Sequence, residues 1–327
     1  MAAIKFTSLP FALTLLPCSS LATAPKVFSL DFFKEQVLAL ENIKALRRRG
    51  VDLSLSSSAS VLQSKLDTSY LDNSFESGYF TLDTVGLRGI SMDGVQVGVA
   101  EKGSAVSNGG PEYTNIVGSL VVFPAAASSS SLLFGGVDTE KHSGSLVNLP
   151  ISGLPDPSLH DLEVQFTSLT ISDSSGTSSL TPPDMVLSAC LDSGTTQMLL
   201  HNSIVEQIIQ YTGAVEGFFP CNLSTRDTIL TFGFGGKDGA RISVPMSELI
   251  MSYVGDTFFA DGTEACELGV WGQPASEEVI LGDTFLRSAC VVYNLDAKRI
   301  GFAHAKWDAG SASNFVEIDK ENPMPER

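Results

Sequence analysis

Beyond Gly50 the chain consists largely of short runs in which apolar and polar residues alternate, as in 94–99 and 144–149. Residues two apart lie on the same face of a strand, so this period predicts strands with one buried face. Glycine and serine bound many of the runs and predict turns between them. In this part of the chain clear helical spacing occurs only in 201–211, through the apolar residues Ile204, Val205, Ile208 and Ile209. We therefore predict a mostly β protein, and 327 residues with 43% apolar content suffice for a large core.

The N-terminus has the features of a secretory signal. Lys5 precedes an apolar run at 11–16, and small residues at 22–24 provide a cleavage site. We expect residues 1–24 to be removed, which predicts a secreted, extracellular protein.

Residues 25–49 carry apolar side chains at spacings of three and four, which is typical of an amphipathic helix. These side chains are Phe28, Phe32, Phe33, Val37, Leu40 and Ile43. The segment ends in the basic cluster 47–49, so a pro-segment cut by a processing protease is predicted; the alternative is an ordinary N-terminal helix.

Charge and hydropathy restrict the partners. The formal net charge of −17 disfavours nucleic acid and anionic membrane surfaces. No run after the predicted signal approaches the roughly 20 apolar residues of a membrane helix. The tail 311–327 is largely polar, so we expect no membrane anchor.

Four cysteines remain after the predicted signal, and four cysteines allow three pairings. Cys221 and Cys266 flank a strand–turn–strand stretch, where a disulfide would close a long loop, and we predict that pair. Cys190 and Cys290 lie in apolar runs and are predicted to be buried thiols.

The residues best suited to chemistry are 192–196, with the sequence Asp-Ser-Gly-Thr-Thr. An apolar strand at 186–191 delivers Asp192 into a tight turn. Gly194 lets the backbone pass close to the carboxylate, and the hydroxyls of Ser193, Thr195 and Thr196 are able to donate hydrogen bonds to it. Asp, Ser and Gly also form ordinary turns, so the motif alone does not establish a catalytic site.

Further motifs follow in a recognisable order. The turn at 192–196 is followed by VILGDTFLR at 279–287 and VVYNLD at 291–296, and it is preceded by LLFGGVD at 132–138. Over about 132–307 the chain resembles the C-terminal lobe of pepsin-like aspartic proteases, especially the fungal secreted branch.

This resemblance implies a bilobal β fold, with an N-terminal lobe at 50–135 and a C-terminal lobe at 136–310. Each lobe of the family contributes one aspartate, and the two carboxylates share a proton and hold the attacking water. By resemblance Asp192 is one of the pair and Ser193 buttresses its turn. Thr195 orients the carboxylate, and Thr196 lies beside the substrate. Residues 280–282 would pack behind the turn.

The N-terminal half departs from the family pattern. Tyr70 matches the tyrosine of the substrate flap, the alternative being a surface tyrosine in a turn; 77–85 and 95–99 match the strands that follow. The chain contains no Asp-Thr-Gly, and only about twenty residues separate Gly50 from Tyr70. Asp67 is the nearest substitute for the first aspartate, although it fits better as part of the strand that enters the flap.

The N-terminal lobe is therefore predicted to be incomplete. A truncated or mis-spliced gene model, loss of catalysis, and completion by another chain are three explanations. A monomer is expected, and a homodimer that uses two copies of Asp192 is the alternative.

Other chemistries have less support. The four histidines show no metal-ligand spacing, the glycine-rich run 232–236 lacks the Lys-Ser or Lys-Thr of a phosphate loop, and no G-x-S-x-G is present. We expect no metal or cofactor. The sequence thus predicts an aspartic endopeptidase that cuts exposed polypeptides between bulky apolar residues; the alternative is an inactive secreted relative that binds peptides.

Overall fold

The computed structural model divides the chain into two compact units. One unit contains Met1–Pro25 and Glu35–Ser119, and the other contains Lys26–Lys34 and Leu120–Arg327. The structure describes residues 3–5, 28–33, 60–69, 75–87, 90–104, 129–152, 162–193, 195–215, 217–225, 227–251, 258–294, 297–307, 309–310 and 312–318. Residues 120–135, which the sequence places with the N-terminal lobe, fall in the second unit.

The first unit contains an antiparallel four-stranded sheet in the order β1-β5-β4-β3. Its strands are β1 (Ala3–Lys5), β3 (Ser60–Ser69), β4 (Phe75–Leu87) and β5 (Ile90–Ser104). The alternating run at 94–99 lies within β5, as its pattern predicts. β4 and β5 pair from Leu87 opposite Ile90 to Phe75 opposite Ser104, so they form one long hairpin.

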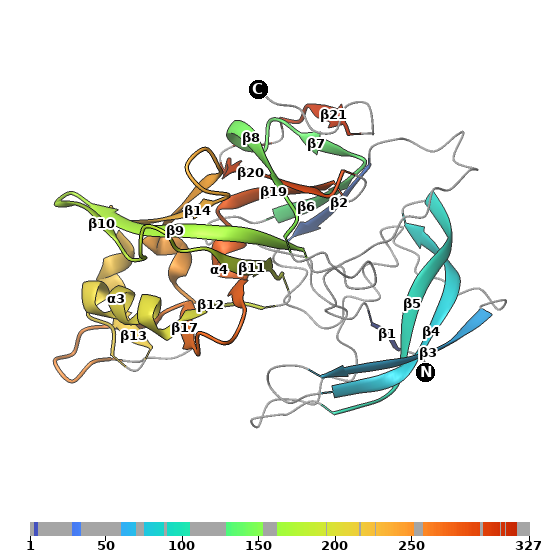
Figure 1. Ribbon diagram of the computed structural model, residues 1–327, viewed down its shortest axis with the longest axis horizontal. Coiled ribbons are helices and arrows are strands. Elements are labelled where there is room, and N and C mark those ends of the chain that lie inside the picture. The colour runs from blue at the N-terminus through green and yellow to red at the C-terminus, as the bar shows by residue number, and fades with distance from the viewer. Residues whose placement is uncertain are drawn as a thin grey trace. The chain divides into compact units, whose positions relative to one another are not determined.

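The second unit is built on an eight-stranded sheet in the order β15-β14-β9-β11-β18-β12-β17, with β10 paired to β9 (Figure 1). Its strands are β9 (Glu163–Asp173), β10 (Gly176–Ser179), β11 (Leu187–Leu191), β12 (Met198–His201), β14 (Ile229–Phe234), β15 (Arg241–Pro245), β17 (Val270–Gln273) and β18 (Val279–Leu281). β11 and β18 are parallel, whereas β9 is antiparallel to β11.

Smaller sheets and short helices complete the second unit. A three-stranded sheet contains β19 (Ala289–Asn294), β20 (Arg299–Ala305) and β8 (His142–Pro150). The paired strands are β2 (Phe28–Phe33) with β6 (Ser129–Phe134), β7 (Gly136–Asp138) with β21 (Phe315–Glu317), and β13 (Phe218–Pro220) with β16 (Ala265–Glu267). The helices are α3 (Asn202–Thr212), α4 (Asp283–Leu286), and the 3-10 helices η2 (Cys221–Thr225) and η3 (Met246–Leu249).

The helix predicted for 25–49 is wrong at 28–33, where the chain forms β2. Phe28 and Phe32 belong to the helical pattern, but together with Leu30 they also alternate with polar residues, so they satisfy the period of two as well. In the structure the backbone of this segment pairs with β6. The predicted signal peptide and pro-segment boundaries stay predictions.

The helix predicted at 201–211 is confirmed as α3, displaced by one residue. Ile204, Val205 and Ile208 are buried, because residues three and four apart lie on one face of a helix. Gly213 ends the helix in the left-handed region (φ 70°) and its N–H donates to the Ile209 carbonyl. Figure 1 shows α3 beside β12 and β17 at the end of the large sheet.

β9 contains a break in its alternation that the structure explains. Val164 and Phe166 are fully buried, but the next buried residues are Leu169 and Ile171, so the phase changes. The register with β14 shifts at this point, since Gly233 pairs with Ser168 while the next residue pairs with Phe166. One extra residue returns the apolar side chains to the core face.

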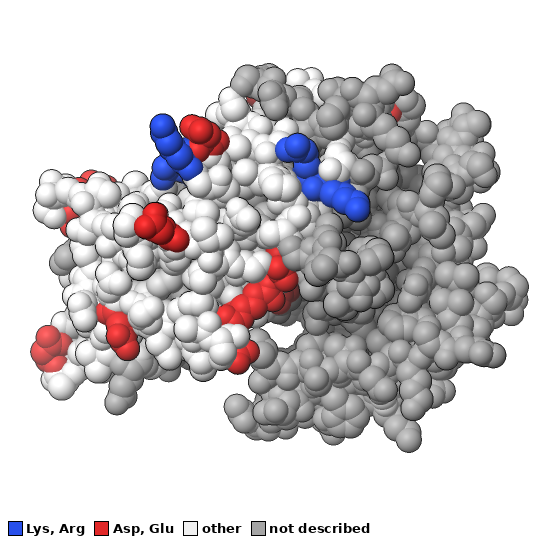
Figure 2. Space-filling model, viewed as in Figure 1, with Lys and Arg blue, Asp and Glu red and all other residues white. Residues whose placement is uncertain are grey.

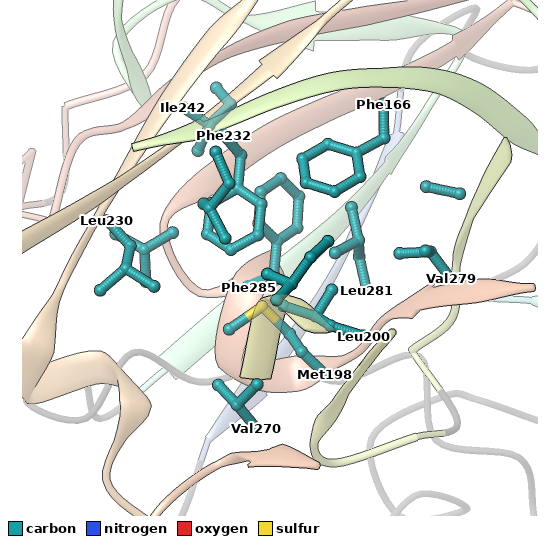
Figure 3. Close-up of a cluster of buried hydrophobic side chains, with 14 of the residues drawn as sticks. Phe166, Met198, Leu200, Leu230, Phe232, Ile242, Val270, Val279, Leu281 and Phe285 are labelled. Atoms are coloured by element: carbon teal, nitrogen blue, oxygen red, sulfur yellow. The ribbon is translucent and has the colours of Figure 1, made fainter. Parts of the chain in front are cut away.

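Aromatic residues form the centre of the core (Figure 3). Phe285 of α4 lies 5.2 Å from Phe232 and 5.6 Å from Phe234 between ring centroids, in edge-to-face geometry. Phe166 completes the group at 5.8 Å from Phe232. Such pairs add about 0.5–1.5 kcal/mol each to the free energy gained from burial. α4 follows β18 directly, so this core also supports the segment behind Asp192.

The disulfide between Cys221 and Cys266 is confirmed. It joins η2 to β16. The strand β13, which directly precedes η2, also pairs with β16. Within the part of the chain that the structure describes, none of the helices has the length and apolar character needed to cross a membrane.

Candidate active site

Asp192 stands at the end of β11, where a buried strand delivers it to one face of the sheet. Ala189 and Leu191 point into the core, and Asp192 is half-buried. The Asp192 N–H donates to the Leu281 carbonyl at 3.1 Å, which continues the parallel ladder with β18 by one residue. The backbone of Asp192 is therefore fixed by the sheet, although it lies beyond the strand.

The carboxylate of Asp192 is held by a neighbour in its own turn. The Thr195 hydroxyl donates to Asp192 Oδ2 at 2.6 Å, and the Thr195 N–H donates to the Asp192 carbonyl at 3.3 Å. A bond to a charged acceptor is stronger than a neutral one, so it restricts the rotamer of the acid. The turn presents a positioned carboxylate that stays partly accessible.

The segment at 282–284 packs against the back of this turn, and it overlaps only at Gly282 with residues 280–282, which the family resemblance implies there. The N–H of Asp283 donates to the Thr195 carbonyl at 2.8 Å, and the N–H of Thr284 donates to the Thr196 carbonyl at 3.1 Å. A Cβ on Gly282 would lie 2.3 Å from the Thr195 carbonyl oxygen and 2.2 Å from that of Gln197. Only glycine allows this close approach.

The buried residue Thr284 connects the segment at 282–284 to the loop at Gly269. Thr284 is fully buried, and its hydroxyl donates to the Gly269 carbonyl at 2.9 Å. The same carbonyl accepts the Met198 N–H at 2.9 Å. Three segments distant in sequence thus meet around the turn, and the motif at 279–287 carries the contacts that hold it.

A carboxylate and a hydroxyl that the sequence analysis missed lie near this turn. Ser188 of β11 donates a hydrogen bond to the Glu163 carboxylate on β9. Glu163 stands directly opposite Cys190 in the β9–β11 ladder. The alternation of 187–192 places Ser188, Cys190 and Asp192 on one face, but no local pattern identifies β9 as the neighbouring strand.

Tyr293 of β19 was also missed. Burial raises the pKa of Tyr293 above the ordinary value, and electrostatic interactions with Cys190 and Asp192 raise it further. The residue as a whole keeps 39% of its surface exposed. The phenol therefore stays protonated and lies within electrostatic range of Asp192.

The structure describes some of the other predicted site residues but not all of them. Ser193 is half-buried and Thr196 is exposed, while Gly194 and Tyr70 lie outside the described residues. Asp67 pairs with Ser77 in the β3–β4 ladder, so it lies in a strand of the first unit. The roles of these residues and the identity of the second aspartate stay predictions. Within the described residues, His, Cys, Asp and Glu form no group of three or more suited to a metal ion.

Comparison with known proteins gives consistent matches. The family model for eukaryotic aspartyl proteases matches residues 115–305. "Probable aspartic-type endopeptidase opsB" of Aspergillus oryzae is 30% identical over 304 residues, covering 82% of this chain and 61% of the relative. "Secreted aspartic protease 5" of Candida albicans is 34% identical over 294 residues, covering 79% and 64%.

A solved structure matches as well. The aspartic proteinase from Irpex lacteus superimposes with a TM-score of 0.57 at 21% identity, covering 81% of this chain and 88% of that chain. This likeness concerns the fold. The chain spans less than two thirds of the length of the two curated relatives described above.

Proposed function

Because this chain belongs to the eukaryotic aspartyl protease family, we propose that it is an aspartic-type endopeptidase that hydrolyses polypeptides with water activated at Asp192. The observation that carries the proposal is the hydrogen bond of 2.6 Å from the Thr195 hydroxyl to Asp192 Oδ2. It fixes a partly exposed carboxylate at the end of a sheet strand, where a general base needs a defined direction toward its water.

The chemistry requires two carboxylates that share one proton. Asp192 in its ionised form takes a proton from the water as the oxygen attacks the scissile carbonyl. The protonated partner donates to the carbonyl oxygen, and a proton then reaches the leaving nitrogen as the bond breaks. Asp67 is the partner candidate in this chain, and a second copy of Asp192 in a homodimer is the alternative.

The proposed location is extracellular. Among the relatives, two Candida albicans proteins are named as secreted aspartic proteases. The Cys221–Cys266 disulfide supports this location, since disulfides persist in oxidising compartments. The proposed substrates are exposed polypeptides cut between bulky apolar residues.

The test is cleavage of acid-denatured haemoglobin by the purified chain, with and without a statine-type transition-state inhibitor. We expect inhibitor-sensitive cleavage that Asp192→Asn abolishes, because the amide cannot accept the proton from water. Asp67→Asn and the dependence of rate on protein concentration identify the second carboxylate. A folded protein without cleavage, or cleavage that survives in Asp192→Asn, would overturn the proposal.

A further inference from the structure

Glu163 is a second acid on the same sheet face as Asp192. It stands directly opposite Cys190 in the antiparallel β9–β11 ladder, and opposed side chains project from one face. The intervening residues Ala189 and Leu191 are buried on the other face. Asp192 follows two residues after Cys190 and keeps the ladder bond to Leu281, so it shares the face of Glu163.

The Glu163 carboxylate is held in place but is not neutralised. The Ser188 hydroxyl on the adjacent strand donates to it, and this bond limits its rotamers. Glu163 is half-buried and Ser188 is exposed, so the carboxylate can accept further hydrogen bonds from a ligand. In the part of the chain that the structure describes, Arg287 and Lys306 form the ion pairs, and neither pairs with Glu163.

The separation of Glu163 from Asp192 matches the spacing of residues in an extended peptide. Two residues along a strand cover about 7 Å, and the step across to the neighbouring strand adds about 5 Å, giving a Cα separation of about 8 Å. An extended substrate advances about 3.4 Å per residue. Two residues of an extended substrate span about 7 Å, which is comparable to this separation.

The charge of the protein favours a cationic ligand at this position. The net charge is −17, and Figure 2 shows acidic side chains spread over the described part of one face, with Lys and Arg in its upper half. An overall negative field raises the local concentration of cationic peptides.

We propose that Glu163, oriented by Ser188, is a specificity residue that selects polypeptides with Lys or Arg within about two residues of the scissile bond. This inference rests on the proposed endopeptidase function and names a substrate class for it. A half-buried carboxylate paired with a flexible cation is expected to give a preference of about 3- to 10-fold over an uncharged residue of equal length.

The experiment compares kcat/KM for peptide pairs that differ only by Lys or norleucine at each position flanking the scissile bond. Glu163→Gln keeps the side-chain shape and still accepts the Ser188 hydrogen bond, but it removes the charge. We expect the Lys-to-norleucine ratio of kcat/KM to fall to about 1 in this variant. Ser188→Ala retains the charge but releases the carboxylate, and we expect it to lower the same ratio less than Glu163→Gln does.

The matched control is Glu206→Gln, which removes the same charge from the exposed face of α3. We expect it to keep the Lys preference, because solvent and salt screen an exposed charge on α3 that does not contact the bound peptide. A Lys-to-norleucine ratio that Glu163→Gln leaves unchanged, or that Glu206→Gln reduces equally, overturns the assignment to Glu163.

A binding measurement separates this inference from the proposed function. If the wild-type chain cleaves no peptide, the endopeptidase proposal fails. Calorimetry then measures the binding of the same peptides with a reduced, uncleavable bond, and this tests whether Glu163 recognises Lys. Tighter binding of the Lys peptide that disappears in Glu163→Gln supports the specificity role. Equal binding of both peptides, or binding of neither, overturns it.

Discussion

Replacing Gly282 by alanine tests whether close backbone packing holds the turn that carries Asp192. The new Cβ would lie 2.2 Å from the Gln197 carbonyl oxygen and 2.3 Å from that of Thr195. Both contacts are about 1 Å shorter than van der Waals packing allows, and both involve backbone, so no side chain can rotate away. The 195–197 segment must move instead, and Thr195 moves with it.

The expected cost follows from these contacts. Forcing a methyl group into packed backbone costs about 1–3 kcal/mol, and here two carbonyls are displaced, which favours the upper end. Gly282 has ordinary dihedral angles (φ −84°, ψ −160°), so alanine gains about 0.4–1 kcal/mol from a less flexible unfolded chain. A net loss of about 2 kcal/mol lowers the Tm of a unit this size by about 4–8 °C.

The assay combines thermal unfolding by circular dichroism with inhibitor-sensitive peptide cleavage. Gly236→Ala is the control, because its Cβ would meet open space and its cost is confined to strain at φ +83°. We expect both variants to lose stability but only Gly282→Ala to lose most of its activity. Wild-type Tm and full cleavage in Gly282→Ala would refute the reasoning.

Further predictions concern the turn, the disulfide and a surface hairpin. Thr195→Val removes the hydroxyl that holds the Asp192 carboxylate. If Asp192 is the proposed base, we expect kcat to fall about 10- to 100-fold while Thr195→Ser retains activity; steady-state kinetics checks this. Replacing Cys221 and Cys266 by alanine opens a loop of 45 residues, and we expect urea unfolding to show a loss of about 2–4 kcal/mol. Hydrogen bonds from Ser175 and Tyr211 lower the pKa of Asp173 from 3.8 to about 2. The folded pKa is depressed, so their stabilisation is present above pH 4 and is lost as the pH falls toward 2; Tyr211→Phe should raise this pKa in a carboxyl NMR titration.

Local patterns predict some elements of this fold well. The helix at 202–212 follows from its buried isoleucines, because a spacing of three and four has no competing interpretation there. The phenylalanines at 28–33 satisfy both a helical and an alternating pattern, and only the partner strand β6 decides between them. Local periodicity is therefore insufficient where tertiary pairing supplies the backbone partners.

The site shows the same division between local and distant information. The link between Asp192 and Thr195 could be predicted, because the acid and its donor lie three residues apart in one turn. Glu163 was missed, since its position beside Ser188 depends on which strand pairs with β11. Strand order is a property of the whole sheet, and no short sequence window contains it.

The parallel pairing of β11 with β18 also determines when the catalytic turn can form. Ala189 pairs with Val279, so the chain must close a loop of 90 residues before Asp192 gains its ladder bond. Contacts between residues this distant in sequence form late and slowly, because loop entropy is lost before they add stability. The turn at Asp192 therefore gains this backbone support only after residues 279–281 have been synthesised and have paired with β11.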